Sequence, residues 1–264
     1  MSAARRVGLV GWGAIGRVVG TALAAGEIPG ATLHRVVDNR PLGDLPAPQS
    51  TFEDAVADCD LIVEAAGQSV VREWGARVLR AGTDLLVAST GALTDEDLTK
   101  ELLTTGPGRV YFTGGAVGGL DLLQAARRMG ELHHVELTTT KLPSTLEQPW
   151  MDAELLHRMR TADGPVEVLR GTARDIPVKF PKSTNVAASV ALAVGDLDAV
   201  RVTVVADPAA THTRHVIEAA GTHGSYRFEV CHLPDPVNPA TSQVVPHAVL
   251  RSLGALAGRS GAIL

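Results

Sequence analysis

The sequence carries its strongest structural signal at residues 7–16, which read Val-Gly-Leu-Val-Gly-Trp-Gly-Ala-Ile-Gly. The first four residues are typical of a short buried strand, and a helical pattern begins where the stretch ends. Between them the glycines have the spacing G-x-G-x-x-G. In such a loop one glycine allows a tight turn, one lets the backbone approach a pyrophosphate, and one lets helix and strand pack closely.

The first turn of the following helix would offer free N–H groups to those phosphates. A glycine turn without a nucleotide is the plainer alternative, because glycine-rich loops are common. The complete strand–loop–helix context favours a dinucleotide-binding loop. We predict that this loop consists of Gly11, Gly13, Ala14, Ile15 and Gly16.

A second predicted strand, 32–37, ends directly before Asp38, roughly 20 residues beyond the last glycine of the loop. A carboxylate there accepts hydrogen bonds from the ribose hydroxyls of NAD and repels the 2′-phosphate of NADP. Arg40 follows two residues later and could either turn toward such a phosphate or lie in solvent. We therefore expect NAD as the cofactor, with NADP possible.

The first half of the chain alternates strand and helix patterns, which is typical of a parallel sheet with crossover helices. The predicted strands are 7–10, 32–37, 61–64, 85–88 and 110–112, and the predicted helices are 15–25, 69–81 and 94–103, with Thr94 as the N-cap of the last. Beyond about residue 115 a helix at 120–129 precedes strands at 134–140, 166–172 and 202–206, with an Ala/Val-rich helix at 182–193 and a final helix at 240–264.

These patterns predict an α/β protein. A Rossmann dinucleotide-binding domain with a parallel sheet would comprise residues 1–115 and 239–264. A smaller α+β domain for substrate binding and dimerisation would comprise residues 116–238, with hinges near 113–119 and 236–239.

Composition narrows the class of protein. The chain has 264 residues, 45% hydrophobic and 20% charged, an ordinary globular balance. A net charge of -5 argues against a nucleic-acid partner. The longest apolar stretch, around 186–194, is too short to cross a membrane, and no signal-peptide pattern is visible, so we expect a cytoplasmic protein.

The sequence predicts neither a disulfide framework nor a metal site. Cys59 and Cys231 are too few for a framework and are interpreted as free buried thiols. His133 and His134 are adjacent and would point to opposite faces of a strand. His212 and the later His215 have helical spacing, but no matching Cys, Asp or Glu pattern accompanies them.

Several particular motifs follow one another in order along nearly the whole chain. Besides the glycine loop they are Glu64-Ala65-Ala66-Gly67-Gln68, Ser89-Thr90-Gly91-Ala92-Leu93, Gly114-Gly115-Ala116-Val117-Gly118-Gly119-Leu120-Asp121, Lys141-Leu142-Pro143, Phe180-Pro181-Lys182, Asn185-Val186-Ala187-Ala188, Asp207-Pro208 and Asn238-Pro239-Ala240-Thr241-Ser242. In these motifs the sequence resembles the L-aspartate dehydrogenase family. The resemblance implies oxidative deamination of L-aspartate to oxaloacetate through iminoaspartate, the reverse reductive amination with ammonia, and a homodimer.

Residue by residue, the resemblance implies that Ala116 and Asn185 contact NAD and that His215 is the active-site histidine. From the residues alone, Asn185 could instead cap the Ala-rich helix that follows it. A lone histidine is more often structural than catalytic. The chain departs from the family pattern at Val216, where a glutamate is usual, and before Asn185, where an asparagine-rich run is usual; both departures bear on the substrate.

An amino-acid dehydrogenase needs a proton acceptor, and a histidine with a pKa near 6.5 can serve at neutral pH, so His215 is the candidate. A dicarboxylate substrate also needs cationic or neutral donors. We predict that these are Lys141, Lys182, Ser183 and Thr184, although either lysine could equally be a solvated surface charge.

Two alternatives remain at this point. One is a related enzyme of the same architecture, such as a homoserine-dehydrogenase-like or dihydrodipicolinate-reductase-like reductase, or an amine dehydrogenase for another oxo acid. The other is a non-catalytic NAD(H) sensor, which would usually carry a basic DNA-reading module. No helix-turn-helix pattern or basic run is visible in the sequence.

Overall fold

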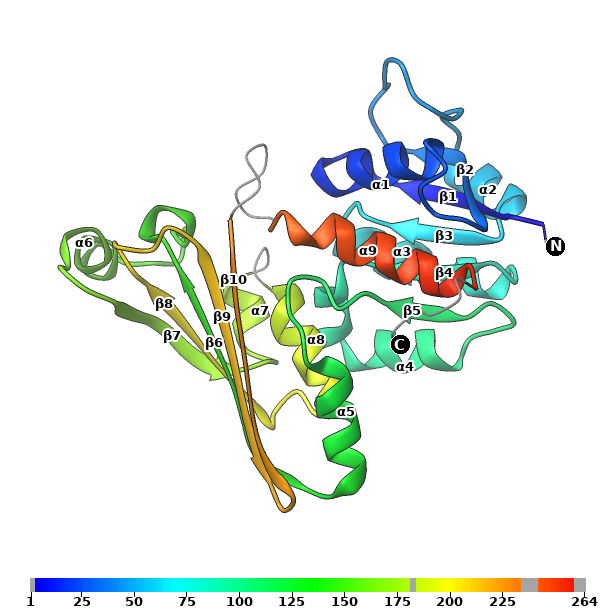
Figure 1. Ribbon diagram of the computed structural model, residues 1–264. Helices are drawn as coiled ribbons and strands as arrows, with labels where there is room; N and C mark the ends of the chain where they lie inside the picture. Colours follow the sequence, from blue (N-terminus) through cyan, green and yellow to red (C-terminus); the bar gives the residue numbers. More distant parts are fainter. Residues whose placement is uncertain (1–2, 181–183, 234–241, 259–264) are drawn as a thin grey trace. The chain divides into compact units, whose positions relative to one another are not determined.

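The computed structural model describes residues 3–180, 184–233 and 242–258. The chain divides into two compact units. Unit 1 is formed by Met1–Gly115 with Val244–Leu264, and unit 2 by Ala116–Gln243. Each unit has its own five-stranded sheet (Figure 1). The hinge expected at 236–239 lies outside the described residues.

The sheet of unit 1 is entirely parallel, with the order β2-β1-β3-β4-β5. Its strands are β1 (Arg5–Val10), β2 (Ala31–Val37), β3 (Leu61–Glu64), β4 (Asp84–Val87) and β5 (Val110–Phe112). The chain runs from β1 outward to β2 and then returns to β3 on the other side of β1. The carboxyl ends of β1 and β3 therefore form the switch point at which such sheets bind ligands. The predicted Rossmann domain is confirmed.

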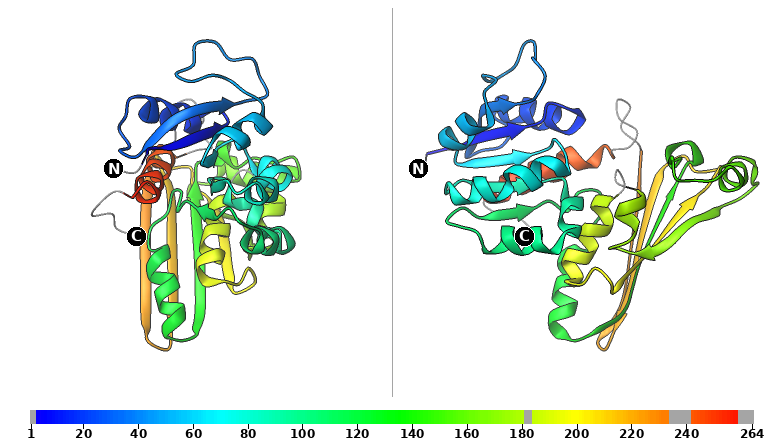
Figure 2. Two further views of the ribbon diagram at one scale, coloured as in Figure 1. Left: turned by 90° about the vertical axis from the view of Figure 1, so that its right-hand side faces the viewer. Right: turned by 180° about the vertical axis from the view of Figure 1, so that it is seen from behind.

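Helices cover both faces of this sheet, and Figure 2 (left) separates the two layers. They are α1 (Ala14–Ala24) and α9 (Val244–Leu256) on one face, and α2 (Phe52–Asp58), α3 (Gln68–Arg80) and α4 (Glu96–Thr104) on the other. Alternation along β1 points Leu9 toward the first layer, where it clusters with Val19 of α1 and Val249 of α9. The expected final helix is present over 244–256, and its remaining predicted residues lie mostly outside the described part.

The helix expected to begin at Thr94 begins later. Thr90–Thr94 form a 3-10 helix, η1, and the N-cap of α4 is Asp95, whose side chain accepts a hydrogen bond from the Leu98 N–H. Helix α2 was missed because it is short; Thr51 caps it by accepting from the Asp54 N–H. Both caps are side chains that satisfy free N–H groups of a first turn.

Unit 2 has a mixed sheet in the order β10-β9-β6-β8-β7, in which only the β6–β8 pair is parallel. Its strands are β6 (Leu132–Lys141), β7 (Val166–Thr172), β8 (Val200–Ala206), β9 (Thr213–Gly221) and β10 (Gly224–His232). Its helices are α5 (Leu120–Met129), α6 (Ala153–Thr161), α7 (Ile176–Lys179) and α8 (Thr184–Val194), with a 3-10 turn, η2, at Pro143–Thr145. This confirms the expected α+β character.

One face of the unit 2 sheet packs against α5 and α8, which lie side by side (Figure 1). Alternate residues of each strand supply this face. From β6 they are Val135 and Leu137, which pair with Ala219 and Ile217 of β9. Farther along the strands, alternate residues still point to this face, but they are polar instead of apolar.

The hairpin of β9 and β10 was not predicted, and it corrects two expectations. His212 and His215 do not share a helix face, because His215 lies in β9. Cys59 is buried as expected, but Cys231 is exposed, since it lies on β10 at the edge of the sheet. Both cysteines are free thiols.

Glu64, the last residue of β3, is fully buried and links two loops at the carboxyl edge of the unit 1 sheet. Its Oε1 accepts from the N–H groups of Ala66 and Gly67, at 2.8 and 2.7 Å, and from the Ser89 hydroxyl, at 2.8 Å. Its Oε2 accepts from the Ser89 N–H at 2.9 Å. Burial raises the pKa of this carboxyl, and the four donors act against that effect. Glu64 thereby fixes the loop 65–67 against the loop that begins at Ser89.

We expect Glu64→Gln to lower the free energy of unfolding by about 1–3 kcal/mol. The amide NH2 of glutamine cannot accept a hydrogen bond, so at least one buried donor would lose its acceptor. Urea denaturation measures this difference. Glu73→Gln on the exposed side of α3 is the control and should change stability by less than about 0.5 kcal/mol. Equal stability of the two variants would show that Glu64 does not hold the loops.

Candidate functional site

The glycine loop between β1 and α1 is held by close backbone contacts. Gly11 has φ +95°, a conformation that favours glycine, and its N–H donates to the Val37 carbonyl at 2.8 Å. A Cβ at Gly16 would lie 1.9 Å from the carbonyl oxygen of Gly11. No side chain can therefore replace either hydrogen without moving the turn.

Gly13 is different, because a Cβ placed there would meet no atom within 4 Å. The space above this residue is open, and Gly13 is the N-cap of α1, so the first N–H groups of an 11-residue helix point toward it. Open space at the positive end of a helix suits an anion. The loop thus fits a pyrophosphate, as the glycine spacing predicts.

Asp38 follows β2 directly and lies beside this loop, with its side chain only 7% exposed. Its carboxylate accepts from the Trp12 N–H at 2.9 Å and from the Arg40 N–H and guanidinium at 2.9 to 3.0 Å. The Arg40 guanidinium holds the pKa of Asp38 well below its usual range, so this carboxylate is ionised. Arg40 is a paired side chain rather than a freely solvated one.

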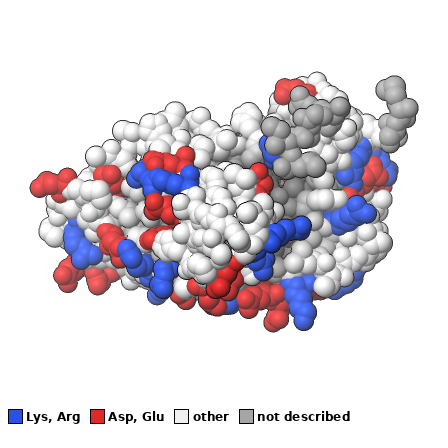
Figure 3. Space-filling view, turned by 60° about the horizontal axis from the view of Figure 1, so that its bottom comes forward, with Lys and Arg blue, Asp and Glu red and all other residues white. Residues whose placement is uncertain are grey.

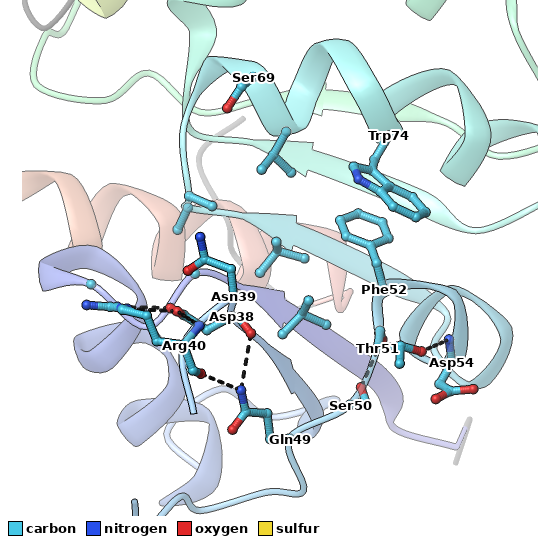
Figure 4. Close-up of a pocket in the computed structure, with 17 residues that line it drawn as sticks. Asp38, Asn39, Arg40, Gln49, Ser50, Thr51, Phe52, Asp54, Ser69 and Trp74 are labelled. Carbon is cyan, nitrogen blue, oxygen red and sulfur yellow. Dashed lines mark hydrogen bonds and ion pairs between the residues drawn. The ribbon is translucent and has the colours of Figure 1, made fainter. Parts of the chain in front are cut away.

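A pocket of about 880 Å³ continues from Asp38 along the carboxyl edge of the sheet (Figure 4). Gln49 shapes one wall, since its amide donates to the carbonyls of Asp38 and Arg40. On the other side the rings of Phe52 and Trp74 stack with centroids 4.1 Å apart. The pocket combines an ionised carboxylate, a guanidinium and apolar walls, which is the chemistry that a nucleoside needs. Gly11, Gly13 and Asp38 all line it.

In unit 2, His215 lies on the face of the sheet that also carries the core. Its partner in register is Thr139 of β6, and residues in register share a face. Lys141, two residues along β6, is on the same face, as is His232 at the end of β10, which pairs with Thr213. Four polar side chains therefore continue the apolar face at one end of the sheet.

His215 is only 5% exposed, and its Nδ1 lies 3.0 Å from the Thr139 hydroxyl. Burial, with further contributions from the charges of Lys141 and His232, lowers the pKa of His215 to about 3. The expectation of an ordinary pKa near 6.5 was wrong, because the ring is buried and lies near Lys141. The imidazole is neutral at pH 7 and can accept a proton.

Lys141 is 9% exposed, and burial lowers the pKa of its ammonium. It lies two residues beyond Thr139, the register partner of His215, on the same face of the sheet, so the two groups are close to each other. The alternative interpretation of Lys141 as a solvated surface charge is therefore wrong. A base and a cation that share a buried surface can bind an acid and handle its proton.

Ala116 is half-buried at the start of unit 2, and its carbonyl accepts a hydrogen bond from Nε2 of His232 at 2.8 Å. Asn185 is exposed and is the second residue of α8, so it is not the N-cap of that helix. Thr184 begins α8. Lys182 and Ser183 lie outside the described residues.

Sequence reasoning missed Thr139 and His232. The signal for Thr139 was its spacing of two from Lys141 on a strand, which puts both on one face. Nothing local singles out His232, because only the β9–β10 pairing brings it to this face.

Figure 3 shows basic and acidic side chains interspersed on one face of the molecule. Across residues 3–180, 184–233 and 242–258, no helix is long and apolar enough to cross a membrane. Within those same ranges, no three His, Cys, Asp or Glu side chains come together in a group that could hold a metal ion.

Two protein-family models match the chain. Residues 121–256, just over half of it, match the model described as aspartate dehydrogenase, C-terminal. Residues 11–107 match the NAD binding domain of homoserine dehydrogenase. The first half thus matches a type of NAD-binding domain that is also present in homoserine dehydrogenase. The match of the second half to aspartate dehydrogenase distinguishes this chain from homoserine dehydrogenase.

Relatives match over nearly the full length. The L-aspartate dehydrogenase of Ruegeria pomeroyi is 37% identical over 255 residues, covering 94% of this chain and 91% of its own. L-aspartate dehydrogenase 2 of Bordetella pertussis is 34% identical over 263 residues, covering 94% and 95%. The crystal structure of aspartate dehydrogenase from Thermotoga maritima superimposes with a TM-score of 0.76 at 26% identity, covering 98% of this chain and 99% of that one.

The matching family description, the length of these alignments and the fold agree with one another. The chain is an enzyme of the oxidoreductase class and belongs to the L-aspartate dehydrogenase family.

Proposed function

We propose that this protein interconverts L-aspartate and oxaloacetate with a nicotinamide dinucleotide, and that His215 is its proton acceptor. The observation that carries the proposal is the buried pair of His215 and Lys141 on one face of the unit 2 sheet. Such a pair combines a neutral base with a cation, and a dicarboxylic amino acid needs both. Membership in the family supplies the substrate class.

The pyrophosphate would lie on Gly11, Gly13, Ala14, Ile15 and Gly16. Asp38 would accept from the ribose hydroxyls, which favours NAD, and the guanidinium of Arg40 could leave Asp38 for the 2′-phosphate of NADP. Bound NAD supplies a hydride acceptor for the substrate Cα. Ala116 and Asn185 remain proposed cofactor contacts, as the family resemblance implies.

In this reaction the protein's own residues transfer protons and stabilise charge. His215 would accept the proton that the substrate ammonium loses before hydride leaves Cα, and pass it to solvent. The neutral imidazole would then accept the proton of the water that adds to the imine carbon and return it to the departing amine. Release of ammonia completes oxaloacetate. Burial is the main cause of the lowered pKa of His215, and Lys141 adds to it. A dicarboxylate bound at Lys141 would offset this second contribution, so the pKa of the imidazole would rise when substrate is present.

Lys141 is our first candidate for a carboxylate of the substrate, because it is buried and close to His215. Lys182, Ser183 and Thr184 stay candidates for the other. We also propose that the enzyme works in the cytoplasm as a homodimer, as the family resemblance and the sequence suggest.

We expect His215→Ala to lower turnover by at least roughly 100-fold, which is the scale of a lost general acid or base. The affinity for NADH, measured by fluorescence titration, should stay the same because the glycine loop is untouched. His212→Ala, three residues away and exposed, is the control and should keep its activity. Near-normal turnover of His215→Ala would move the assignment to another histidine.

For the cofactor, we expect Asp38→Ala to raise the KM for NAD by about 10- to 100-fold, because charge-assisted hydrogen bonds to the ribose are lost. NADP should be affected less, so its relative use rises. Asp44→Ala, at an exposed position that does not line the pocket, should leave both KM values nearly unchanged. Steady-state kinetics with the two cofactors decide; unchanged selectivity would mean that Asp38 does not contact the ribose.

For the substrate, we expect oxaloacetate to exceed pyruvate in kcat/KM of reductive amination by about 1000-fold or more, since pyruvate lacks the second carboxylate that a buried cation would bind. Lys141→Met should remove most of this preference, and Lys182→Met is the parallel variant. Similar kcat/KM values for oxaloacetate, pyruvate and 2-oxobutyrate in the unmutated enzyme would contradict the aspartate assignment and favour an amine dehydrogenase for another oxo acid.

A further inference from the structure

His215 and Thr139 form a buried polar contact in unit 2. Thr139 is 6% exposed and His215 is 5% exposed. The hydroxyl lies 3.0 Å from Nδ1, and the two residues are directly opposite each other in the β6–β9 register. Because adjacent backbones of a sheet hold both Cα atoms in place, this contact also limits rotation of the imidazole.

The Thr139 hydroxyl is the hydrogen-bond partner that the structure gives to Nδ1 of His215. Val230, the register partner of His215 on β10, is apolar and cannot bond the ring. The Ala116 carbonyl can only accept, so Nε2 of His232 must carry a proton and donate it there. That bond occupies Nε2 of His232, so this nitrogen does not bind Nδ1 of His215.

An imidazole has two nitrogens, and the hydrogen bond made by one decides which of them carries the proton. If Nδ1–H donates to the Thr139 hydroxyl oxygen, Nε2 keeps its lone pair and can accept a proton. The opposite arrangement, in which the hydroxyl donates to Nδ1, would place the proton on Nε2 and remove the base.

We propose that Thr139 is a positioning residue of this enzyme: its hydroxyl oxygen accepts the Nδ1–H of His215, fixes the ring and its tautomer, and leaves Nε2 as the atom that accepts the substrate's proton. This proposal rests on the proposed function, in which His215 is the base. It adds a residue that acts through His215 and does not itself contact the substrate.

The test compares Thr139→Val, which keeps the shape and loses the hydroxyl, with Thr139→Ser, which keeps the hydroxyl. Nitrogen-15 NMR of the histidine rings, assigned with His215→Gln, reports the tautomer in the protein without substrate. We expect His215 to carry its proton on Nδ1 in the unmutated protein and in Thr139→Ser. In Thr139→Val we expect the proton to move to Nε2 or to be shared between the two nitrogens.

Kinetics form the second readout. We expect Thr139→Val to lower kcat by between about 10- and 100-fold, with the KM for NADH unchanged, and Thr139→Ser to restore most of the loss. Thr138→Val is the matched control, because it makes the same change one residue earlier on the opposite face of β6. It should keep both kcat and the His215 tautomer.

The outcomes separate this proposal from the proposed function. An Nε2–H tautomer of His215 in the unmutated protein overturns the role of Thr139, whether or not Thr139→Val folds. An unchanged tautomer and kcat in Thr139→Val overturn it as well. If the unmutated protein does not use aspartate or oxaloacetate, the proposed function fails, while the NMR result still decides what Thr139 does to the ring.

Discussion

The contact between the backbones of Gly11 and Gly16 is the constraint on which the cofactor half of the molecule depends. Since no Cβ fits between them, α1 can begin directly above the end of β1 and direct its free N–H groups over the pocket. The loop after β3 must lie against the same turn, since a Cβ on Gly11 would be only 2.7 Å from the Ala65 carbonyl oxygen. Glu64 then ties that loop to the next one along the sheet. Backbone contacts, more than side chains, set this binding edge.

In unit 2 the deciding feature is strand register. The apolar alternation of β6 and β9 fixes which residues face α5 and α8, because a slip by one position would turn every side chain to the other face. The same alternation carries Thr139, Lys141 and His215 onto that face. Their polar groups therefore lie in dry surroundings, where a hydrogen bond and a nearby charge act more strongly than in water.

Much of the fold could be predicted from the sequence, because local patterns carry it. The β3 strand at 61–64 and the helix at 120–129 follow from periodicity alone, and the glycine spacing indicates the switch point. The β9–β10 hairpin was missed. Strand β10 lies at the edge of the sheet and alternates exposed and half-buried residues, which is a weak signal. Likewise, the place of Asp38 beside the glycine loop can be predicted from its spacing in the sequence. The ion pair of Arg40 and the lowered pKa of His215 cannot, because they depend on burial and tertiary neighbours. Such properties are set by packing and leave no local trace.

The order of elements along the chain has a consequence for biosynthesis. Unit 1 is interrupted by unit 2: α9 supplies Val249 and Leu253 to the cluster that contains Val7 and Leu9 of β1. A ribosome delivers β1 to β5 first, then the whole of unit 2, and α9 only afterwards. Unit 2 is continuous and can fold while translation proceeds, whereas the nascent first unit keeps an apolar strip of α1 and β1 uncovered. Unit 1 therefore stays incomplete until the last part of the chain is available, and the apolar surface that α9 covers lacks this partner until then.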